Sequence, residues 1–314
     1  ECRRLHQMSS SASTVVVVGS INVDQLITIE RHPLPGETLI GTSMEFLPGG
    51  KGANQAVAAA QLGAAVSMVG LVGRDPQAEV ATAILIRSGV DLSNVHAVDG
   101  PTGLALVTVD ANGENTIVII PGANALLDAE AVEASASVIA EAAVVVLQGE
   151  IPESGIAAAM RLATGRVVLN LAPVIELEAA SIRRADPLVV NEHEAALVLA
   201  QLAPNTVIPT EDAELVARLL ECGVPSVVLT RGEKGAICAD RDGAHSVASP
   251  TVVAVDSSGA GDAFVGALSA QLASGSSLAE SVRRAVRVGA FAVQSRGTQT
   301  SYPTLADELP QVRS

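Results

Sequence analysis

Continuous apolar runs alternate along the chain with segments that carry apolar residues on one helical face. Buried parallel strands are apolar on both faces and so appear as unbroken Val, Leu and Ile runs, here at 13–24, 65–73, 142–150, 165–173 and 225–232. Helical periodicity with glycine or proline near the ends is found at 52–63, 75–90, 152–163, 211–223, 261–275 and 277–295, and 185–202 has the pattern of a strand turning directly into a helix. The alternation predicts an α/β fold: an open, mostly parallel sheet with helices on both faces.

Two segments depart from this rhythm. Residues 24–47 and 102–121 alternate apolar and polar positions, which favours half-buried strands. In the second segment Asn112-Gly113 separates two such stretches, the strongest short-range signal for a hairpin. We therefore expect a small antiparallel β lid, which buries its apolar face by covering a ligand cleft or by pairing with another subunit.

The remaining boundaries follow from composition. We expect one catalytic domain over 15–305, a disordered or tag-like stretch at 1–14 with Met8 as the natural start, and a tail at 306–314. No apolar run reaches the roughly 18 residues of a membrane span, and the start lacks a secretory signal. Three cysteines without CxxC spacing favour a reducing, cytoplasmic setting.

Charge and aromatic content limit the partners. The formal net charge is −15 and aromatic residues make up 1% of the chain. An acidic surface repels phosphate backbones, and base stacking needs aromatic side chains, so we expect no nucleic-acid partner. A small anionic substrate would need a local site built to accept it.

The stretch 256–264, DSSGAGDAF, places small residues and one acid where a helix should begin. Helix N-termini present unpaired N–H groups and a positive dipole, and the glycines let an anion approach Gly259, Ala260 and Gly261 closely. Asp262 could accept a proton from an attacking hydroxyl group. The alternative is that an acid in the first turn only favours the helix dipole.

Two polar segments are candidates for binding hydroxyl groups. Asn22 and Asp24 follow the first strand, at the sheet edge where open α/β folds bind ligands. The Gly49–Asn54 loop, which includes Gly50 and Lys51, precedes a helix and exposes backbone. Ordinary turns and caps explain both segments equally well.

Asn191 and Glu194 lie three residues apart where a strand becomes a helix. A carboxylate there could hold the water shell of Mg²⁺, or the two side chains could form a capping box. The common nucleotide motifs are absent, because GGKGAN does not fit GxxxxGK[ST] and GAGDAFVG lacks the GxGxxG spacing.

Together these motifs resemble the ribokinase, or PfkB, family of carbohydrate kinases over about residues 15–305. The segments that carry the resemblance are GGKGANQAVAAAQLG at 49–63, DSSGAGDAFVGAL at 256–268, GSINVD at 19–24, PGANA at 121–125 and NEHEA at 191–195. The resemblance implies ATP-dependent phosphorylation of a hydroxymethyl group, here O5 of D-ribose. Kinases for another pentose, deoxyribose or a nucleoside remain alternatives, as does a non-catalytic sugar-binding protein.

The resemblance also implies roles for individual residues. Asp262 would be the general base, and Gly259, Ala260 and Gly261 would form the anion hole. The sugar would be held by Asn22, Asp24, Gly50, Lys51, Asn54 and Glu150. ATP would be held by Asn191, Thr230, Gly232, Gly235 and Gly261, and Glu194 would organise Mg²⁺ through water.

A monovalent-cation site and a dimer are implied in the same way. The oxygens that match the family's K⁺ site belong to Asp256, Ser258, Ala292, Gly297 and Ser301. The family commonly has Thr where this chain has the Ser257-Ser258 pair, and Ser keeps the hydroxyl. The lid segments would also form the contact of a homodimer.

Overall fold

The computed structural model describes residues 14–312, so most of the expected N-terminal stretch, with Met8, lies outside the described residues. Nine strands form the main sheet in the order β13-β12-β11-β10-β9-β8-β1-β4-β5. Neighbouring strands are parallel, except that β12 runs antiparallel to both β11 and β13. Their bounds are β1 Thr14–Val18, β4 Ala65–Gly73, β5 Asp91–Val98, β8 Val144–Gln148, β9 Arg166–Asn170, β10 Leu188–Asn191, β11 Val227–Thr230, β12 Ala236–Asp240 and β13 Gly243–Val247.

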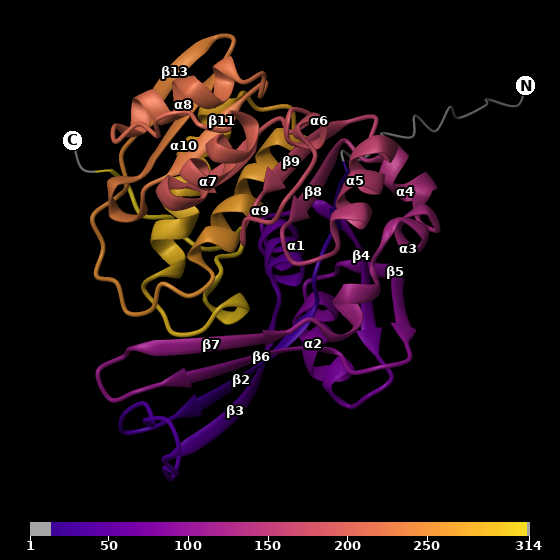
Figure 1. Ribbon diagram of the computed structural model, residues 1–314, viewed down its shortest axis with the longest axis vertical. Coiled ribbons are helices and arrows are strands. Elements are labelled where there is room, and N and C mark those ends of the chain that lie inside the picture. Colours follow the sequence, from indigo (N-terminus) through magenta and orange to yellow (C-terminus); the bar gives the residue numbers. More distant parts are fainter. Residues whose placement is uncertain (1–13, 313–314) are drawn as a thin grey trace, which may run out of the picture.

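Helices cover both faces of this sheet, as the sequence predicts (Figure 1). Alternate valines of β1 divide the core, because Val15 and Val17 join one cluster while Val16 and Val18 join the other. The first cluster includes α1 Lys51–Gln61, α2 Gln77–Arg87, α9 Ala260–Ala273 and α10 Leu278–Ala292. The second includes α3 Ala129–Glu133, α4 Ala136–Glu141, α5 Glu153–Leu162, α6 Ala179–Ile182, α7 Glu192–Leu202 and α8 Asp212–Glu221.

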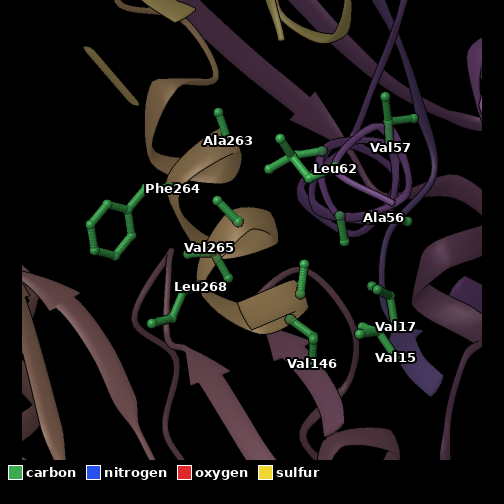
Figure 2. Packing of buried hydrophobic residues seen from close by; sticks show 14 of the residues in the cluster. Val15, Val17, Ala56, Val57, Leu62, Val146, Ala263, Phe264, Val265 and Leu268 are labelled. Carbon is green, nitrogen blue, oxygen red and sulfur yellow. The ribbon is translucent and has the colours of Figure 1, made fainter. Parts of the chain in front are cut away.

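The first cluster is built almost entirely from aliphatic side chains. Figure 2 shows α9, with Phe264, Val265 and Leu268, next to α1, with Ala56 and Val57, and Val17 of β1 and Val146 of β8 below the two helices. Small residues on both helices let α1 and α9 lie close together over the centre of the sheet. The helix pair therefore fixes the position of any polar residue that it carries at the sheet edge.

The two irregular segments form a second sheet, in the order β3-β2-β6-β7. Its strands are β2 Asn22–Thr28, β3 Ser43–Gly49, β6 Gly103–Val109 and β7 Asn115–Ile120. The predicted hairpin is present as β6 and β7, and β2 pairs antiparallel with β3, but β2 and β6 run parallel. Figure 1 shows this sheet extending away from the main body.

Several elements were not predicted. β5 and β13 are partly polar edge strands that lack a clear period, and β12 is a short buried run whose four apolar residues are too few to show a period. The short 3-10 turns η1 Gly122–Leu126, η2 Gly232–Lys234 and η3 Gln299–Ser301 are equally hard to foresee. In the expected tail, Arg287 of α10 donates hydrogen bonds to the carbonyls of Leu309 and Pro310. Within residues 14–312, no helix combines the length and apolar composition that crossing a bilayer requires.

Candidate active site

The order of the sheet strands places the site. The chain moves from β1 to β4 and β5 on one side and returns to β8 on the other, so the strand order reverses at β1 and β8. Ligands of open α/β sheets bind at the carboxyl edge near such a reversal. A pocket of about 200 Å³ opens near this edge, lined by Lys51, Asn170, Ala172, Val189, Asn191, Glu194, Thr230, Gly259, Gly261, Asp262 and Val265. It brings together seven of the residues predicted from the sequence.

Asp262 is the most buried charged group of this pocket, with 6% of its surface exposed. It lies in the first turn of α9. Its Oδ2 accepts a hydrogen bond from the Asn54 amide and its Oδ1 accepts one from the Gln55 amide, both over 2.9 Å. Each carboxylate oxygen keeps a second lone pair, so the group can still accept a proton from a ligand.

The backbone at the start of α9 is shaped for an anion. Gly259 caps the helix with φ 70°, a left-handed conformation that favours glycine. A methyl group on Gly261 would meet no atom within 4 Å, so the backbone there faces open space. First-turn N–H groups have no partner within a helix, and beside Asp262 they can stabilise a transferring anionic group.

Charged groups surround Asp262. Burial, with repulsion from Glu150 and Asp262, raises the pKa of Asp24 to about 6. The Asp262 carboxylate raises the pKa of Lys51 against the effect of its burial, and Glu150 adds to this. Glu150 accepts hydrogen bonds from the Ser20 hydroxyl over 2.5 Å and from the Lys51 backbone over 3.1 Å. The partly buried Lys51 ammonium group is therefore attracted by several acids at once.

The predicted sugar residues lie beside the pocket rather than in its wall. Of these six residues only Lys51 lines it. The Asn124 amide donates to Asn22 Oδ1 over 2.6 Å, which fixes the Asn22 amide at the base of the small sheet. A methyl group on Gly50 would fall 2.8 Å from the Asn22 nitrogen, so the Gly50 loop packs directly on this strand. The group continues the site toward the small sheet.

Asn191 and Glu194 form the predicted capping box. Asn191 Oδ1 accepts from the Glu194 backbone and Glu194 Oε2 accepts from the Asn191 backbone, each over 2.9 Å. Both side chains also line the pocket. Burial raises the pKa of Glu194. The cap and a role toward a ligand are thus compatible.

Gly232 and Gly235 are the two predicted nucleotide residues that the pocket wall does not include. Gly232 has φ 53° and open space around it. A side chain on Gly235 would overlap the Val247 carbonyl of β13, so this glycine serves the close approach of two backbone segments. Among residues 14–312 there is no cluster of three or more His, Cys, Asp or Glu side chains suited to a metal.

Asp256 joins the two segments that carry the predicted cation residues. Its Oδ1 accepts from the Ser258 backbone over 2.9 Å and its Oδ2 from the Gly297 backbone over 3.0 Å. Burial opposes ionisation of Asp256, but these N–H donors outweigh it and lower the pKa. The Ala292 carbonyl accepts from Ser295 and the Ser301 hydroxyl donates to Thr298. The segments meet directly behind the start of α9, where Tyr302 donates to the Gly259 carbonyl.

Sequence reasoning missed four amide side chains around Asp262. They are Gln55, Gln148, Asn170 and Gln299, all buried. Gln55 stands next to Asn54 in a motif that was recognised, and Gln148 and Asn170 are polar residues ending apolar strands. A buried polar residue in such a run signals a hydrogen-bond network. Nothing in the sequence around Gln299 singles it out.

Comparison with known proteins identifies the family of the chain. The profile of the "pfkB family carbohydrate kinase" group matches residues 12–305. Ribokinase of Schizosaccharomyces pombe is 36% identical over 305 residues, covering 93% of this chain and 96% of that protein. Deoxyribokinase of Salmonella typhi is 35% identical over 297 residues, covering 93% and 96%. The structure of Arabidopsis thaliana ribokinase complexed with ribose and ATP superposes with a TM-score of 0.85 at 31% identity, covering 93% and 96%.

Proposed function

Because the chain belongs to the pfkB family of carbohydrate kinases, we propose that it transfers the γ-phosphoryl group of ATP to the 5-hydroxyl group of D-ribose. The products are D-ribose 5-phosphate and ADP. The observation that carries the proposal is Asp262, a buried carboxylate in the wall of a pocket and in the first turn of a helix where the Gly261 backbone faces open space in the same pocket. The full-length similarity to ribokinases supports ribose as the acceptor.

The reaction follows from this arrangement. Asp262 accepts the proton of the ribose 5-hydroxyl as its oxygen attacks the γ-phosphorus. The bond from that phosphorus to the bridging oxygen breaks, and ADP leaves with the electron pair. Charge on the transferring group is stabilised by the N–H groups at Gly259, Ala260 and Gly261, and phosphoryl transfer asks the protein mainly for such positioning and charge stabilisation.

The sugar is held on the lid side of Asp262. Asp24 and Asn22 of β2, with Gly50, Lys51, Asn54 and Glu150, supply acceptors and donors for its hydroxyl groups. The Asp24 carboxylate accepts no hydrogen bond from another described residue, and burial and neighbouring acids oppose its charge. A partly buried carboxylate without donors gains from the vicinal hydroxyl groups of a ligand. Hydrogen bonds from vicinal hydroxyl groups to Asp24 therefore favour a polyol ligand such as a pentose.

The nucleotide occupies the opposite side. Asn191, Thr230 and Gly261 line the pocket there, and Gly232 and Gly235 form the turn that follows β11. Glu194 is a hard oxygen donor at the pocket wall, which fits Mg²⁺ held through water. Mg²⁺ would neutralise charge on the ATP phosphates when bound. The Asp262 and Glu194 carboxylates flank Lys51, which balances their charge.

A monovalent cation completes the proposal. Asp256, Ser258, Ala292, Gly297 and Ser301 supply oxygens from two segments that already meet through Asp256. K⁺ bound there would hold these segments together directly behind the anion hole. It would therefore activate the enzyme without contacting substrate.

We also propose that the small sheet is a lid and the contact of a homodimer. β7 exposes four consecutive apolar residues, Ile117, Val118, Ile119 and Ile120, and β3 exposes Met44 and Phe46. Exposed apolar area of this kind marks interaction sites. Sedimentation equilibrium of the parent and of Ile119→Lys tests the dimer.

The two described cysteines, Cys222 and Cys238, are free, in keeping with the proposed cytoplasmic location.

The activity is tested by measuring ADP release with D-ribose, 2-deoxy-D-ribose, other pentoses and nucleosides, with and without K⁺. Ribose should give the highest kcat/KM. The similarity to a deoxyribokinase makes 2-deoxy-D-ribose the most relevant competitor, and its preference over ribose would reverse the assignment. Asp262→Asn should lower kcat by roughly 10²- to 10⁴-fold, the range for loss of a general base.

A further inference from the structure

Each carboxylate oxygen of Asp262 ends a separate chain of two side-chain amides. In one chain Gln148 donates to Gln55 Oε1 over 2.7 Å, and Gln55 donates to Asp262 Oδ1 over 2.9 Å. In the other, Gln299 donates to Asn54 Oδ1 over 2.9 Å, and Asn54 donates to Asp262 Oδ2 over 2.9 Å. We call these chains the two amide relays. They join α9 to α1, β8 and η3.

The direction of each relay follows from the chemistry of its end. A carboxylate only accepts hydrogen bonds, whereas a carboxamide has a donating and an accepting end. Gln55 and Asn54 must therefore turn their NH₂ ends toward Asp262 and their oxygens away. Those oxygens then need donors, and Gln148 and Gln299 supply them. Assuming the proposed role of Asp262, we propose that Gln148 and Gln299 are positioning residues that keep both α1 amides turned to donate to the catalytic carboxylate.

Burial makes this orientation matter. Gln55 and Gln148 are 0% exposed and Gln299 is 2% exposed. At the far end of each relay the Gln148 and Gln299 oxygens have no hydrogen-bond partner among residues 14–312. If the Gln148 relay ran the other way, the Gln148 oxygen would gain a donor but the Gln55 oxygen would face Asp262. The charge on Asp262, and not the number of pairs, sets the direction.

Neighbouring contacts support the first relay. The Gln55 amide also donates to Asn170 Oδ1 over 3.0 Å, and Asn170 donates to the Val189 carbonyl over 3.1 Å. A side chain on Gly19 would overlap the Gln148 amide oxygen. Only glycine at position 19, directly after β1, therefore leaves room for the Gln148 side chain. The relay is built into the backbone as well as into the side chains.

The relays act on Asp262 separately from its charged neighbours. The titratable groups that face Asp262 are Lys51 of α1, Asp24 of β2, Glu194 of α7 and Tyr302 after η3. Neither Gln148 nor Gln299 belongs to this set, and neither lines the pocket. Substituting them changes the amides and leaves the ligand-facing charges in place.

The test compares Gln148→Glu, Gln148→Met, Gln299→Glu and Gln299→Met with the parent enzyme. Each Glu variant offers Gln55 or Asn54 an acceptor, so that amide turns away from Asp262. We expect kcat to fall about 10- to 100-fold, the acidic limb of the kcat/KM profile to move to higher pH, and the KM for ATP to change less than about twofold. The Met variants remove the donor without adding charge and should show smaller shifts in the same direction.

Gln201→Met is the matched control. Gln201 is likewise a hydrogen-bonded glutamine, because its amide NH₂ donates to the Ile175 carbonyl and its amide oxygen accepts from the Leu177 backbone N–H. It lies outside the site. Its kcat and pH profile should equal those of the parent. Thermal melts show whether each variant is folded, and the Met pair decides the outcome if a Glu variant is not.

A double-mutant cycle separates positioning from simple packing. With Asp262→Asn the carboxylate is gone, so Gln148→Met should have no further effect on the residual kcat. Equal fold losses in both backgrounds, or pH profiles of all four variants that superpose on the parent, would overturn the proposal. All ratios are measured with whichever sugar the parent phosphorylates, so failure of ribose as substrate contradicts the proposed function and leaves the relay test intact.

Discussion

Gly266 of α9 lies so close to Ala58 of α1 that a methyl group on the glycine would fall 2.5 Å from the alanine Cβ and 2.6 Å from the Gln55 carbonyl oxygen. One helical turn toward the N-terminus of each helix, Asp262 faces Asn54 and Gln55. The close crossing therefore sets the distance between the carboxylate and its two amide donors. Small residues in α1 and α9 serve the site as well as the core.

Gly266→Ala should impair both folding stability and turnover. The added methyl group overpacks the crossing, which costs about 1–3 kcal/mol, and it pushes Asp262 away from α1. Thermal denaturation and kcat with ribose measure the two effects. Gly289→Ala is the control, because its methyl group would meet the Ala260 oxygen at 3.5 Å, an ordinary contact. A Gly266→Ala enzyme with parental kcat would show that the crossing does not position Asp262.

The two glycines that begin α9 should respond differently to alanine. On Gly261 the methyl group enters open space, and helix propensity gains about 0.5–1 kcal/mol, so stability should hold or rise while kcat falls because the phosphoryl group is obstructed. On Gly259 the left-handed φ and contacts with Thr298 and Tyr302 make the change destabilising. Melts and single-turnover rates of both variants distinguish the outcomes, and unimpaired phosphoryl transfer by Gly261→Ala would contradict an anion hole at this backbone.

The local motifs were foreseeable because their chemistry lies in adjacent residues. The glycines and Asp262 stand together in the sequence, and so do Asn191 and Glu194. From the sequence, the capping box and the ligand site were alternative interpretations of Asn191 and Glu194. The structure shows that the same pair of residues forms the cap and lines the pocket. Short spacing reveals a local contact but not what else the same side chain faces.

Long-range contacts explain what the sequence could not reveal. Gln148 and Gln55 are 93 positions apart, and Gln299 and Asn54 are 245 apart. Only the sheet order and the α1–α9 crossing bring them together. The family resemblance implies that Gly235 holds ATP, and the structure shows that its backbone also packs against Val247. A glycine pattern alone does not distinguish space for a ligand from space for a neighbouring strand.

Asp24 should make sugar binding depend on pH near 6. Its folded-state pKa is about 6 against an ordinary 3.8, so the carboxylate is lost as the pH falls through 6, and the KM for ribose should rise there. The KM of Asp24→Asn should be high and independent of pH. Steady-state kinetics from pH 5 to 8 at saturating ATP measure this, and a parental KM that stays constant over the range would contradict the role of Asp24.

The same pKa shift predicts that the ionised Asp24 carboxylate, which helps to bind the sugar, destabilises the folded protein. A raised pKa means that the folded protein binds the proton more tightly, so the free energy of unfolding falls as pH rises from 3.8 to 6 and stays lower above it, by about 3 kcal/mol. Asp24→Asn should therefore melt at higher temperature than the parent at pH 7.5, and this advantage should shrink toward pH 4. Asp242→Asn, in an exposed turn, is the control. A difference in melting temperature between Asp24→Asn and the parent that stays constant across this pH range would show that the ionised Asp24 does not destabilise the fold.

Glu194→Gln separates the helix cap from the metal. Glutamine at this position still accepts from the Asn191 backbone, so the capping box survives and stability should change by less than about 0.5 kcal/mol. Without the charge, the Mg²⁺ concentration for half-maximal activity should rise about tenfold or more. Because burial raises the pKa of Glu194, the parent should also need more Mg²⁺ as the pH falls, and Glu194→Gln should not. Glu192→Gln, an exposed change of the same kind in the same turn, should follow the parent, and identical Mg²⁺ curves for all three proteins would remove Glu194 from the metal site.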